Sequence, residues 1–428
     1  MRPSALTWRR LTRLGRFASV QVAVQVLAFA SGIVLVQSMT PAQYGHYTLA
    51  VAMAGLGNVL VDLGLSTAVL ATGGPLHDDP ARLGELAADA FALQRWLLPA
   101  GGLVLAPVFA ALFLRHDIAP WAVAGLTLLV LATIAVNVRN AIGLSLVRLR
   151  SDLAVQQRLD LAVNGSKLLL VVAAVAVYLD AFIALAIAFV AAVATATVLR
   201  RYLHARFGVL AKPTGAHRAA LLRGVRRQAP YALYYCLSAQ IAVWLIGWLG
   251  SAERVAEVGA LGRLSAAFAI IGATVVGVVQ PYFARASAWR EVVGGVLVVN
   301  AFFAVLTAAL VGLALAVPGA LLWVLGPHYA GLHGELVWMV LSAALSLWGG
   351  TLYGLGAARG WFVPASLAIA LGIATMVVCA QALDVGTVLG CLVMNSVTAA
   401  VSLLLLLGML ARRLAAGTAA PAIVTASP

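Results

Sequence analysis

Long apolar segments alternate with short polar turns along almost the whole chain. Most of the segments contain roughly twenty residues, the length with which an α-helix crosses a bilayer core of ~30 Å. Helices satisfy their backbone hydrogen bonds internally, so they are the expected form of such segments in lipid. The pattern predicts about twelve membrane-spanning helices, over Phe17–Gln37, Tyr47–Leu70, Phe91–Leu114, Ile118–Val138, Leu161–Leu179, Ala181–Leu199, Tyr231–Leu249, Val258–Tyr282, Val293–Val317, Leu336–Ala357, Trp361–Gln381 and Val385–Leu410. The predicted fold class is an all-α polytopic membrane protein.

The composition agrees with this pattern and excludes a water-soluble protein. Hydrophobic residues make up 63% of the chain and charged residues 10%, whereas a soluble domain carries about 25% charged residues. The net charge of +14 does not indicate nucleic-acid binding, because the basic residues lie mostly in turns and at helix ends. If the N-terminus is cytoplasmic, nearly all of them fall on the cytoplasmic side, and only Arg115 and Arg254 fall opposite. An even number of spans then returns the C-terminus to the cytoplasm.

One long polar segment, residues 200–229, divides the chain into two similar halves. Residues 1–199 are expected to form an N-terminal lobe of six helices, and residues 230–428 a C-terminal lobe of six. The two halves open in a similar way, with Arg13–Phe17 before the first helix and Arg223–Pro230 before the seventh. Six helices per half give both copies the same orientation, which predicts a parallel repeat about an axis along the membrane normal. The basic segment between them is expected to be a cytoplasmic linker that lies on anionic membrane lipid as an interfacial helix.

Several short motifs occur in a characteristic order. They are Thr40-Pro-Ala-Gln-Tyr-Gly-His-Tyr47, Asp62-Leu-Gly-Leu-Ser-Thr67, Leu221-Leu-Arg-Gly224 with Pro230, Glu257-Val-Gly259, Gln280-Pro281 and Leu325-Gly-Pro-His-Tyr-Ala330. In this order, and with six helices in each half, the chain resembles Wzx-type polysaccharide flippases of the multidrug/oligosaccharidyl-lipid/polysaccharide (MOP) exporter superfamily. It departs from that family in having Leu261 and Gly262 where an aromatic residue is usual, and in lacking an acidic residue in the seventh helix.

The resemblance implies a transporter with two helical bundles in a V, which alternate between inward-open and outward-open states. The expected substrate is a polyprenyl-pyrophosphate-linked oligosaccharide, moved from the cytoplasmic to the periplasmic leaflet of a bacterial inner membrane for cell-surface polysaccharide biosynthesis. A cavity is needed because a sugar–pyrophosphate head cannot cross hydrocarbon unaided. No cofactor is expected, and the resemblance leaves a proton or a sodium gradient open as the energy source. Other polysaccharide-assembly membrane proteins are the expected partners.

Asp62 is the deepest ionisable residue of the predicted spans. Such residues are rare within membranes and usually face a cavity or a partner. Asp62 lies roughly 12 Å from the cytoplasmic end of the second helix at 1.5 Å per residue. Asn58 and Ser66 lie four residues before and after it, so the three side chains share one face. We expect this face to line a substrate cavity.

Lys167 in the fifth helix lies at a similar depth, and Asp160 and Asn164 continue its polar stripe. The equal depth suggests that Asp62 and Lys167 form a pair. One hypothesis is that they face the interior of the N-terminal lobe and exchange partners during transport. A static structural salt bridge explains the same pattern equally well.

Three further polar residues are candidates for binding substrate. Arg263 and Arg95 could bind pyrophosphate through bidentate hydrogen bonds, although both are shallow enough to extend to the membrane surface instead. Gln25 lies one helical turn after Gln21, and this stripe is either cavity lining or an interhelical contact.

Catalysis has little support in the sequence. The nucleophile motif G-x-S-x-G, the zinc motif H-E-x-x-H and the phosphate-binding loop G-x-x-x-x-G-K are all absent, and neither catalytic residues nor metal ligands are predicted. The closest rival function is an ion-coupled multidrug-type exporter of the same superfamily. Such an exporter would favour acidic cavity groups for organic cations, whereas the deep charges here are mixed in sign. A scaffold role in a polysaccharide-assembly complex is a third reading.

Overall fold

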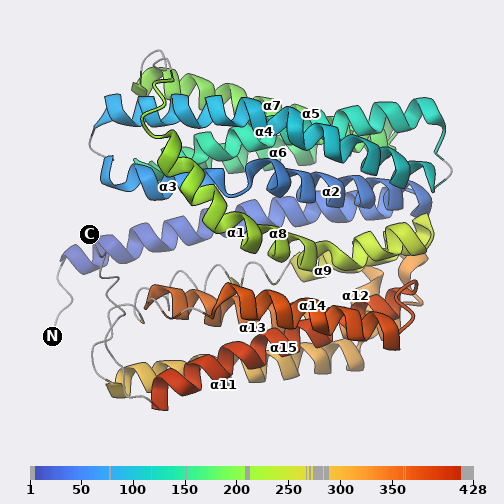
Figure 1. Cartoon of the computed structure of the whole chain (residues 1–428). Coiled ribbons are helices and arrows are strands. Elements are labelled where there is room, and N and C mark those ends of the chain that lie inside the picture. The colour runs from blue at the N-terminus through green and yellow to red at the C-terminus, as the bar shows by residue number, and fades with distance from the viewer. Residues whose placement is uncertain are drawn as a thin grey trace. The chain divides into compact units, whose positions relative to one another are not determined.

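The structure is a computed structural model. It describes residues 5–76, 79–116, 118–150, 152–207, 213–266, 268, 271–272, 283, 289–359, 361 and 363–415. All regular elements of these residues are helices (Figure 1). The helices are α1 (Ala5–Ser38), α2 (Pro41–Asp62), α3 (Leu65–Gly73), η1 (Gly74–Leu76), α4 (Pro80–Leu114), α5 (Pro120–Leu149), α6 (Leu153–Val177), α7 (Ala181–Phe207), α8 (Arg218–Leu249), α9 (Ala252–Ala266), α11 (Trp289–Ala316), α12 (Pro318–Trp323), η2 (Pro327–Tyr329), α13 (His333–Ala358), α14 (Ala365–Ala382) and α15 (Val388–Ala415).

The predicted class of a multi-pass helical membrane protein is confirmed. Among the described residues, 9 helices are long and apolar enough to cross a membrane, and the count rises to 11 if two bent helix pairs are each one span. The bent pairs are α2 with α3, and the two halves of α8. The predicted span Val258–Tyr282 falls largely outside the described residues, so the expected number of twelve is not tested there.

Two compact units divide the chain within α9. The first unit is Met1–Ala256 and the second is Glu257–Pro428. The predicted division into two six-helix lobes with a linker over residues 200–229 stays a prediction.

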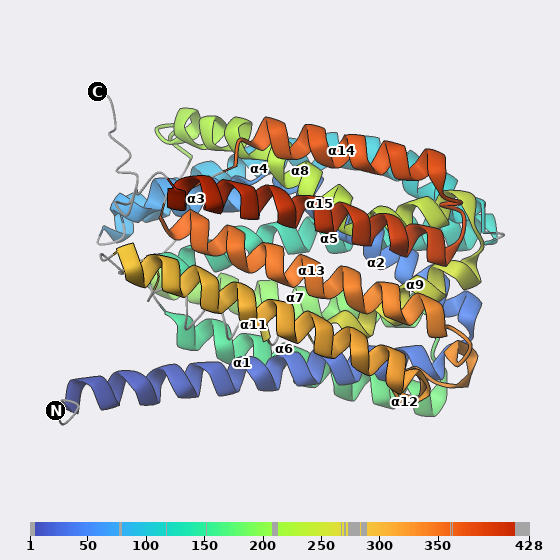
Figure 2. The ribbon, with the colours of Figure 1, turned by 90° about the horizontal axis from the view of Figure 1, so that it is seen from below.

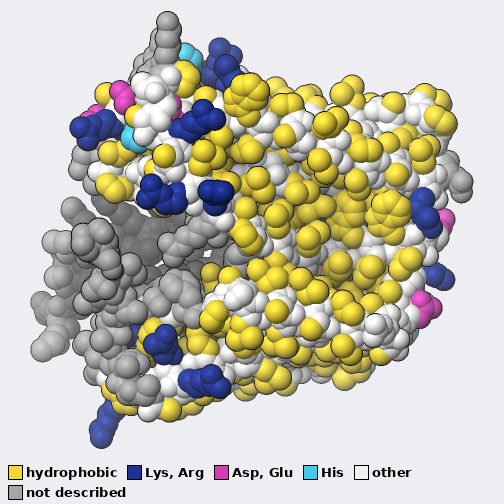
Figure 3. All heavy atoms as spheres, in the orientation of Figure 1, with side chains coloured by type: hydrophobic (Ala, Val, Ile, Leu, Met, Phe, Trp, Pro, Cys, Tyr) yellow, Lys and Arg dark blue, Asp and Glu magenta, His cyan; other side chains and the backbone are white. Residues whose placement is uncertain are grey.

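In the first unit, α5 is the central helix and contacts α2, α3, α4, α6 and α7. α1 packs along α6, and α8 packs against α2 and α3. Hydrophobic side chains cover the middle of the face of this unit drawn in Figure 3, and Lys and Arg side chains gather near the start of α8. Large apolar side chains are exposed on α4, α5 and α6, for example Leu103, Leu128 and Leu169. Exposed apolar side chains along the middle of a helix are expected where a helix faces lipid.

In the second unit, four long helices lie side by side in the order α11, α13, α15, α14 (Figure 2). A hydrogen bond of 2.9 Å from Trp348 Nε1 to Asn300 Oδ1 joins α13 to α11. The Ser396 hydroxyl of α15 donates to the Trp338 carbonyl of α13. Near the end of α13, the buried Arg359 donates to the Phe283 carbonyl over 2.8 Å and lies over the rings of Phe283 and Trp361.

The motif Thr40–Tyr47 is explained by local structure and close packing. Thr40 and Gln43 form a reciprocal capping box at the start of α2, and Pro41 occupies the first helical turn. Gly45 faces the start of α9 so closely that a Cβ atom there would lie 2.0 Å from the Ala252 carbonyl oxygen. The motif therefore begins a helix and allows two chain segments to approach each other.

The predicted single helix Tyr47–Leu70 is broken in its second half. α2 ends at Asp62, and α3 begins at Leu65 with a bend of 46° between the two. Leu63 and Gly64 have φ values of 46° and 81°, which a helix cannot accommodate. Asp62 therefore lies at the end of a helix rather than within one.

The segment before Pro230 is helical, but its apolar face is covered by protein. Leu221 and Val225 are buried in a cluster with apolar residues of α3, α4, α5 and α7. The prediction that this face rests on lipid is therefore wrong for these two residues. The intervening Leu222 and Arg223 are exposed, so only this side of the helix is available to a membrane surface.

Candidate functional site

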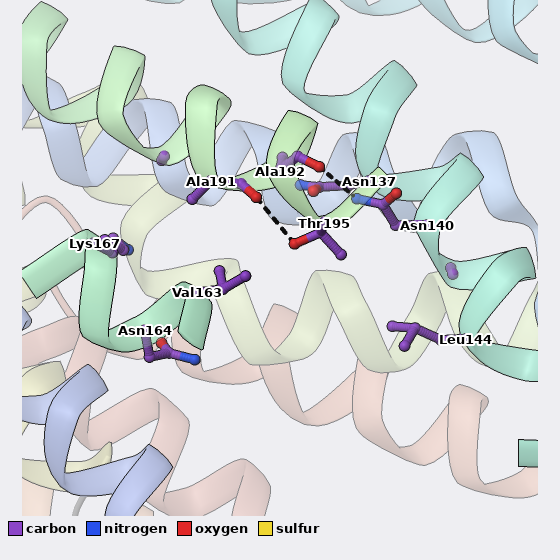
Figure 4. A pocket seen from close by; sticks show the side chains of 11 residues that line it. Asn137, Asn140, Leu144, Val163, Asn164, Lys167, Ala191, Ala192 and Thr195 are labelled. Carbon is purple, nitrogen blue, oxygen red and sulfur yellow. Dashed lines mark hydrogen bonds between the residues drawn. The ribbon is translucent and has the colours of Figure 1, made fainter. Parts of the chain in front are cut away.

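The first unit contains a cavity of roughly 360 Å³ between α5, α6 and α7, here called the lysine cavity. It is lined by Asn137, Asn140, Ala141, Leu144, Val163, Asn164, Lys167, Ala188, Ala191, Ala192 and Thr195. Figure 4 shows Lys167 and Asn164 on α6, with Asn137 and Asn140 on α5 and Thr195 on α7. Lys167 is the one ionisable residue among these lining side chains.

Hydrogen bonds hold the polar side chains of the lysine cavity in place. Asn140 Nδ2 donates to the Ala192 carbonyl over 2.9 Å, and Asn164 Nδ2 donates to the Asp160 carbonyl over 2.8 Å. Thr195 Oγ1 donates to the carbonyl of the preceding turn, as Thr often does within helices. The two asparagine bonds use amide N–H groups and leave the amide oxygens as acceptors. The cavity thus combines one cation with several acceptors, a set that suits an anionic ligand carrying hydroxyl groups.

A second cavity of roughly 320 Å³, here called the aspartate cavity, lies between α2, α3, α5 and α8. It is lined by Asn58, Val59, Asp62, Gly64, Thr67, Asn137, Val138, Ala141 and Ala232. Asp62 accepts hydrogen bonds from the Ser66 hydroxyl over 2.8 Å and from the Ser66 backbone N–H over 3.1 Å. The carboxylate therefore also caps the start of α3.

The structure places Asp62 and Lys167 in different cavities. The two cavities share Asn137 and Ala141, which lie one turn apart on α5. No ion pair joins Asp62 to Lys167 where both side chains are described. The predicted exchange of partners during transport stays a prediction.

The other sequence candidates divide into two groups. Asn58 lines the aspartate cavity and Asn164 the lysine cavity, as neighbours of the two charged residues. Arg95 is exposed on α4, and Gln25 is half-buried on α1, and neither lines either cavity. Arg263 is half-buried in the last turn of α9, within the second unit.

Three cavity residues were not predicted from the sequence. Asn137, Asn140 and Thr195 lie in long apolar helices, and the hydropathy of those segments hides them. The signal available was the pair of asparagines three residues apart, which places two amides on one face of a membrane helix.

No protein-family model and no curated protein matches this sequence. Solved structures match along most of the chain. An inward-facing multidrug resistance MATE family transporter of the MOP superfamily aligns with a TM-score of 0.70 and 16% identity, over 94% of this chain and 98% of that one. The chain has the fold of MOP transporters.

Two more structures show the range of proteins with this fold. The lipid II flippase MurJ, in an inward closed conformation, aligns with a TM-score of 0.76 and 11% identity, over 92% of this chain and 87% of that one. A MOP superfamily transporter from Pyrococcus furiosus, described as having a binding pocket of reverse polarity that suggests a different function, aligns with a TM-score of 0.63 and 16% identity, over 95% of both chains. The MOP fold is thus found in both drug transporters and a lipid flippase, and the substrate must be argued from the cavities.

Proposed function

We propose that this protein is a flippase that moves a polyprenyl-pyrophosphate-linked oligosaccharide from the cytoplasmic to the periplasmic leaflet by alternating access. The proposed location is a bacterial inner membrane, with both termini in the cytoplasm. The proposed process is cell-surface polysaccharide biosynthesis. The proposed role is transport rather than catalysis, and other polysaccharide-assembly membrane proteins are proposed partners.

The lysine cavity carries the proposal. Lys167 supplies a cation to a cavity between three long apolar helices, where an ionisable side chain usually marks a substrate path. The oxygens of Asn137, Asn140 and Asn164 can accept hydrogen bonds from sugar hydroxyls. A pyrophosphate-linked sugar offers both the anion and the hydroxyl donors, whereas a cationic drug would be repelled by the ammonium group.

The MOP fold supports the same reading. MurJ is named as a lipid II flippase, and its chain can be superposed on most of this one. The basic residues of the cytoplasmic turns, among them Arg218, Arg223 and Arg226 on the exposed side of α8, would attract an anionic head group toward the predicted entry side.

A multidrug-type exporter coupled to an ion gradient is the second candidate. It is favoured by the MATE likeness and by Asp62, whose carboxylate lies in a cavity with no Lys, Arg or His among the lining residues that the structure describes. That cavity is near the lower end of the size range for drug-sized ligands.

Replacement of the cavity cation tests the flippase proposal. Lys167→Met removes the ammonium group and keeps a flexible side chain of similar length. Arg158→Met removes a cation from the same helix at an exposed position outside both cavities. In proteoliposomes, we expect Lys167→Met to slow the flipping of a polyprenyl-pyrophosphate oligosaccharide by at least ~10-fold, since one charge-assisted contact is worth about 1.5–3 kcal/mol. Arg158→Met should flip at the wild-type rate. Equal rates for all three proteins would refute the role given to Lys167.

A further inference from the structure

Two arginines lie on the outer surface of the first unit, where α4 packs against α5 (Figure 1). Arg95 of α4 and Arg139 of α5 are both exposed, and neither lines the lysine cavity or the aspartate cavity. Trp96, which follows Arg95, is 76% exposed. These three residues are here called the arginine patch.

Packing of α5 on α4 brings the two positive charges to one side of the helix pair. The guanidinium carbon of Arg139 lies 5.0 Å from the centre of the Phe91 ring on α4. Phe91 and Arg95 are one helical turn apart, so their side chains lie on the same face of α4. A guanidinium group over an aromatic ring keeps its N–H donors in its own plane, where they can bind an oxyanion. The contact with Phe91 therefore positions Arg139 beside the face that carries Arg95 and leaves its donors available.

The two charges are not balanced by an acidic side chain of the described residues. Neither arginine forms an ion pair with a described carboxylate. Asp89 is the nearest acidic residue along α4, but it is buried and accepts hydrogen bonds from backbone N–H groups at residues 215 and 217. Two uncompensated arginines on one surface attract an anion, and phosphate oxygens match their planar forks of donors.

Distances along the helices place the arginine patch at the depth of lipid head groups. Arg115 at the end of α4 lies about 30 Å from Arg95 along the helix, at 1.5 Å per residue. The exposed Trp121 in the first turn of α5 lies roughly 27 Å from Arg139. A bilayer core is ~30 Å thick, and exposed Trp and Arg residues are typical of its two boundaries. With Arg115 and Trp121 at one boundary, the arginine patch lies at the other, which the sequence predicts to be cytoplasmic.

Membrane anchoring alone does not explain this arrangement. A single arginine at a membrane boundary can anchor a helix by extending its side chain to the head groups. Anchoring does not require that two arginines on neighbouring helices lie together at one depth. Nor does it require an aromatic ring that holds one of them in place. Both features are expected where two side chains bind one ligand.

We propose that the arginine patch binds the phosphate group of one anionic phospholipid in the adjoining leaflet. Arg95 and Arg139 donate to the phosphate oxygens from two helices, and the Trp96 ring lies against the glycerol backbone, at the depth that tryptophan favours in membranes. The bound phospholipid bridges α4 and α5 on the outside of the unit. A choline head group carries its own cation and is disfavoured beside two arginines. This surface lies outside both cavities, so the proposal holds whatever substrate the protein transports.

Quenching of Trp96 fluorescence by brominated lipids tests the proposal at the patch itself. The full-length protein is reconstituted in phosphatidylcholine bilayers that contain a small fraction of brominated phosphatidylglycerol or, separately, brominated phosphatidylcholine. The emission of Trp96 is the difference between wild type and Trp96→Phe. In wild type, Trp96 should be quenched more strongly by the anionic lipid, with a relative binding constant of roughly ten, as expected for two charge-assisted contacts at a wet surface.

Three variants separate a phosphate site from general attraction of anionic lipid. Arg95→Gln and Arg139→Gln should each reduce the preference at Trp96 several-fold. Arg139→Lys, which keeps the charge, should retain more of it than Arg139→Gln. Thermal unfolding in lipid-free detergent should show that all three variants are folded.

Two controls complete the experiment. Arg158→Gln removes an exposed charge of α6 and should leave the preference at Trp96 unchanged. Trp323, 80% exposed on α12 of the second unit, should show little preference for the anionic lipid when it is isolated in the same way with Trp323→Phe. Equal quenching of Trp96 by both lipids in wild type, an equal preference at Trp323, or an unchanged preference in both Arg95→Gln and Arg139→Gln would overturn the proposal. None of these results depends on whether the protein flips lipid-linked sugar.

Discussion

Asp89 offers a sharp test of how the first unit positions α8. This buried residue of α4, 4% exposed, accepts hydrogen bonds from the backbone N–H groups of Gly215 over 2.8 Å and His217 over 3.0 Å. His217 is the N-cap of α8 but its own side chain makes no capping bond. Asp89 therefore replaces a local cap and ties the start of α8 to α4 across more than a hundred residues of chain.

The magnitude follows from these two bonds. A hydrogen bond to a charged group contributes about 1.5–3 kcal/mol net. Water can replace part of this at Gly215, which is exposed, so we expect Asp89→Ala to lower the free energy of unfolding by about 2–4 kcal/mol. Asp79→Ala is the matched control, because Asp79 also accepts two backbone N–H bonds, but its side chain is 48% exposed and both bonds are local. Its loss should cost about 1 kcal/mol.

Equilibrium unfolding in mixed detergent micelles measures both variants. Limited trypsin digestion supplies a second measurement, since Asp89→Ala should speed cleavage at Arg218 and Arg223 while Asp79→Ala should not. The reasoning is refuted if Asp89→Ala destabilises the protein no more than Asp79→Ala does.

One substitution in each unit tests close packing. Gly45→Ala should destabilise the protein by about 1–3 kcal/mol in thermal unfolding, because its Cβ atom would meet the Ala252 carbonyl. The control Gly84→Ala, which has open space around the new Cβ atom, should be neutral or stabilising, and the reverse order would contradict the close approach of α2 to the start of α9. Arg359→Lys should cost about 2 kcal/mol because an ammonium group cannot both donate to the Phe283 carbonyl and stack on its ring, and an unchanged unfolding midpoint would show that this contact is not stabilising.

The sequence was sufficient for the fold class because hydropathy and helix length are set by the bilayer. Helix ends were less predictable. α4 begins at Pro80, although its predicted span begins at Phe91, and α8 begins at Arg218 rather than at Tyr231. Hydropathy identifies only the part of a helix that faces apolar surroundings. The helical hydrogen bonding of a span extends beyond its apolar part into polar residues, up to a capping residue. For α4 this residue is Asp79, the N-cap.

The candidate site was predicted in its residues but not in its arrangement. Asp62 and Lys167 do line cavities, yet not the same one. Depth along a helix can be counted from the sequence, whereas rotation about the helix axis depends on packing with neighbours. The break at Leu63 and Gly64 also moves Asp62 to a helix end. Asp89 was missed for a similar reason, since its partners lie far away in the chain.

Flipping by wild-type protein is the most direct measurement of the central claim. Purified protein is reconstituted in liposomes with a fluorescent polyprenyl-pyrophosphate oligosaccharide in the inner leaflet, and its appearance in the outer leaflet is followed beside empty liposomes. The account predicts movement well above the empty liposomes and no ion-driven export of cationic dyes. Export of cationic dyes under a proton or sodium gradient, with no movement of the lipid-linked oligosaccharide, would contradict it and favour a multidrug-type exporter.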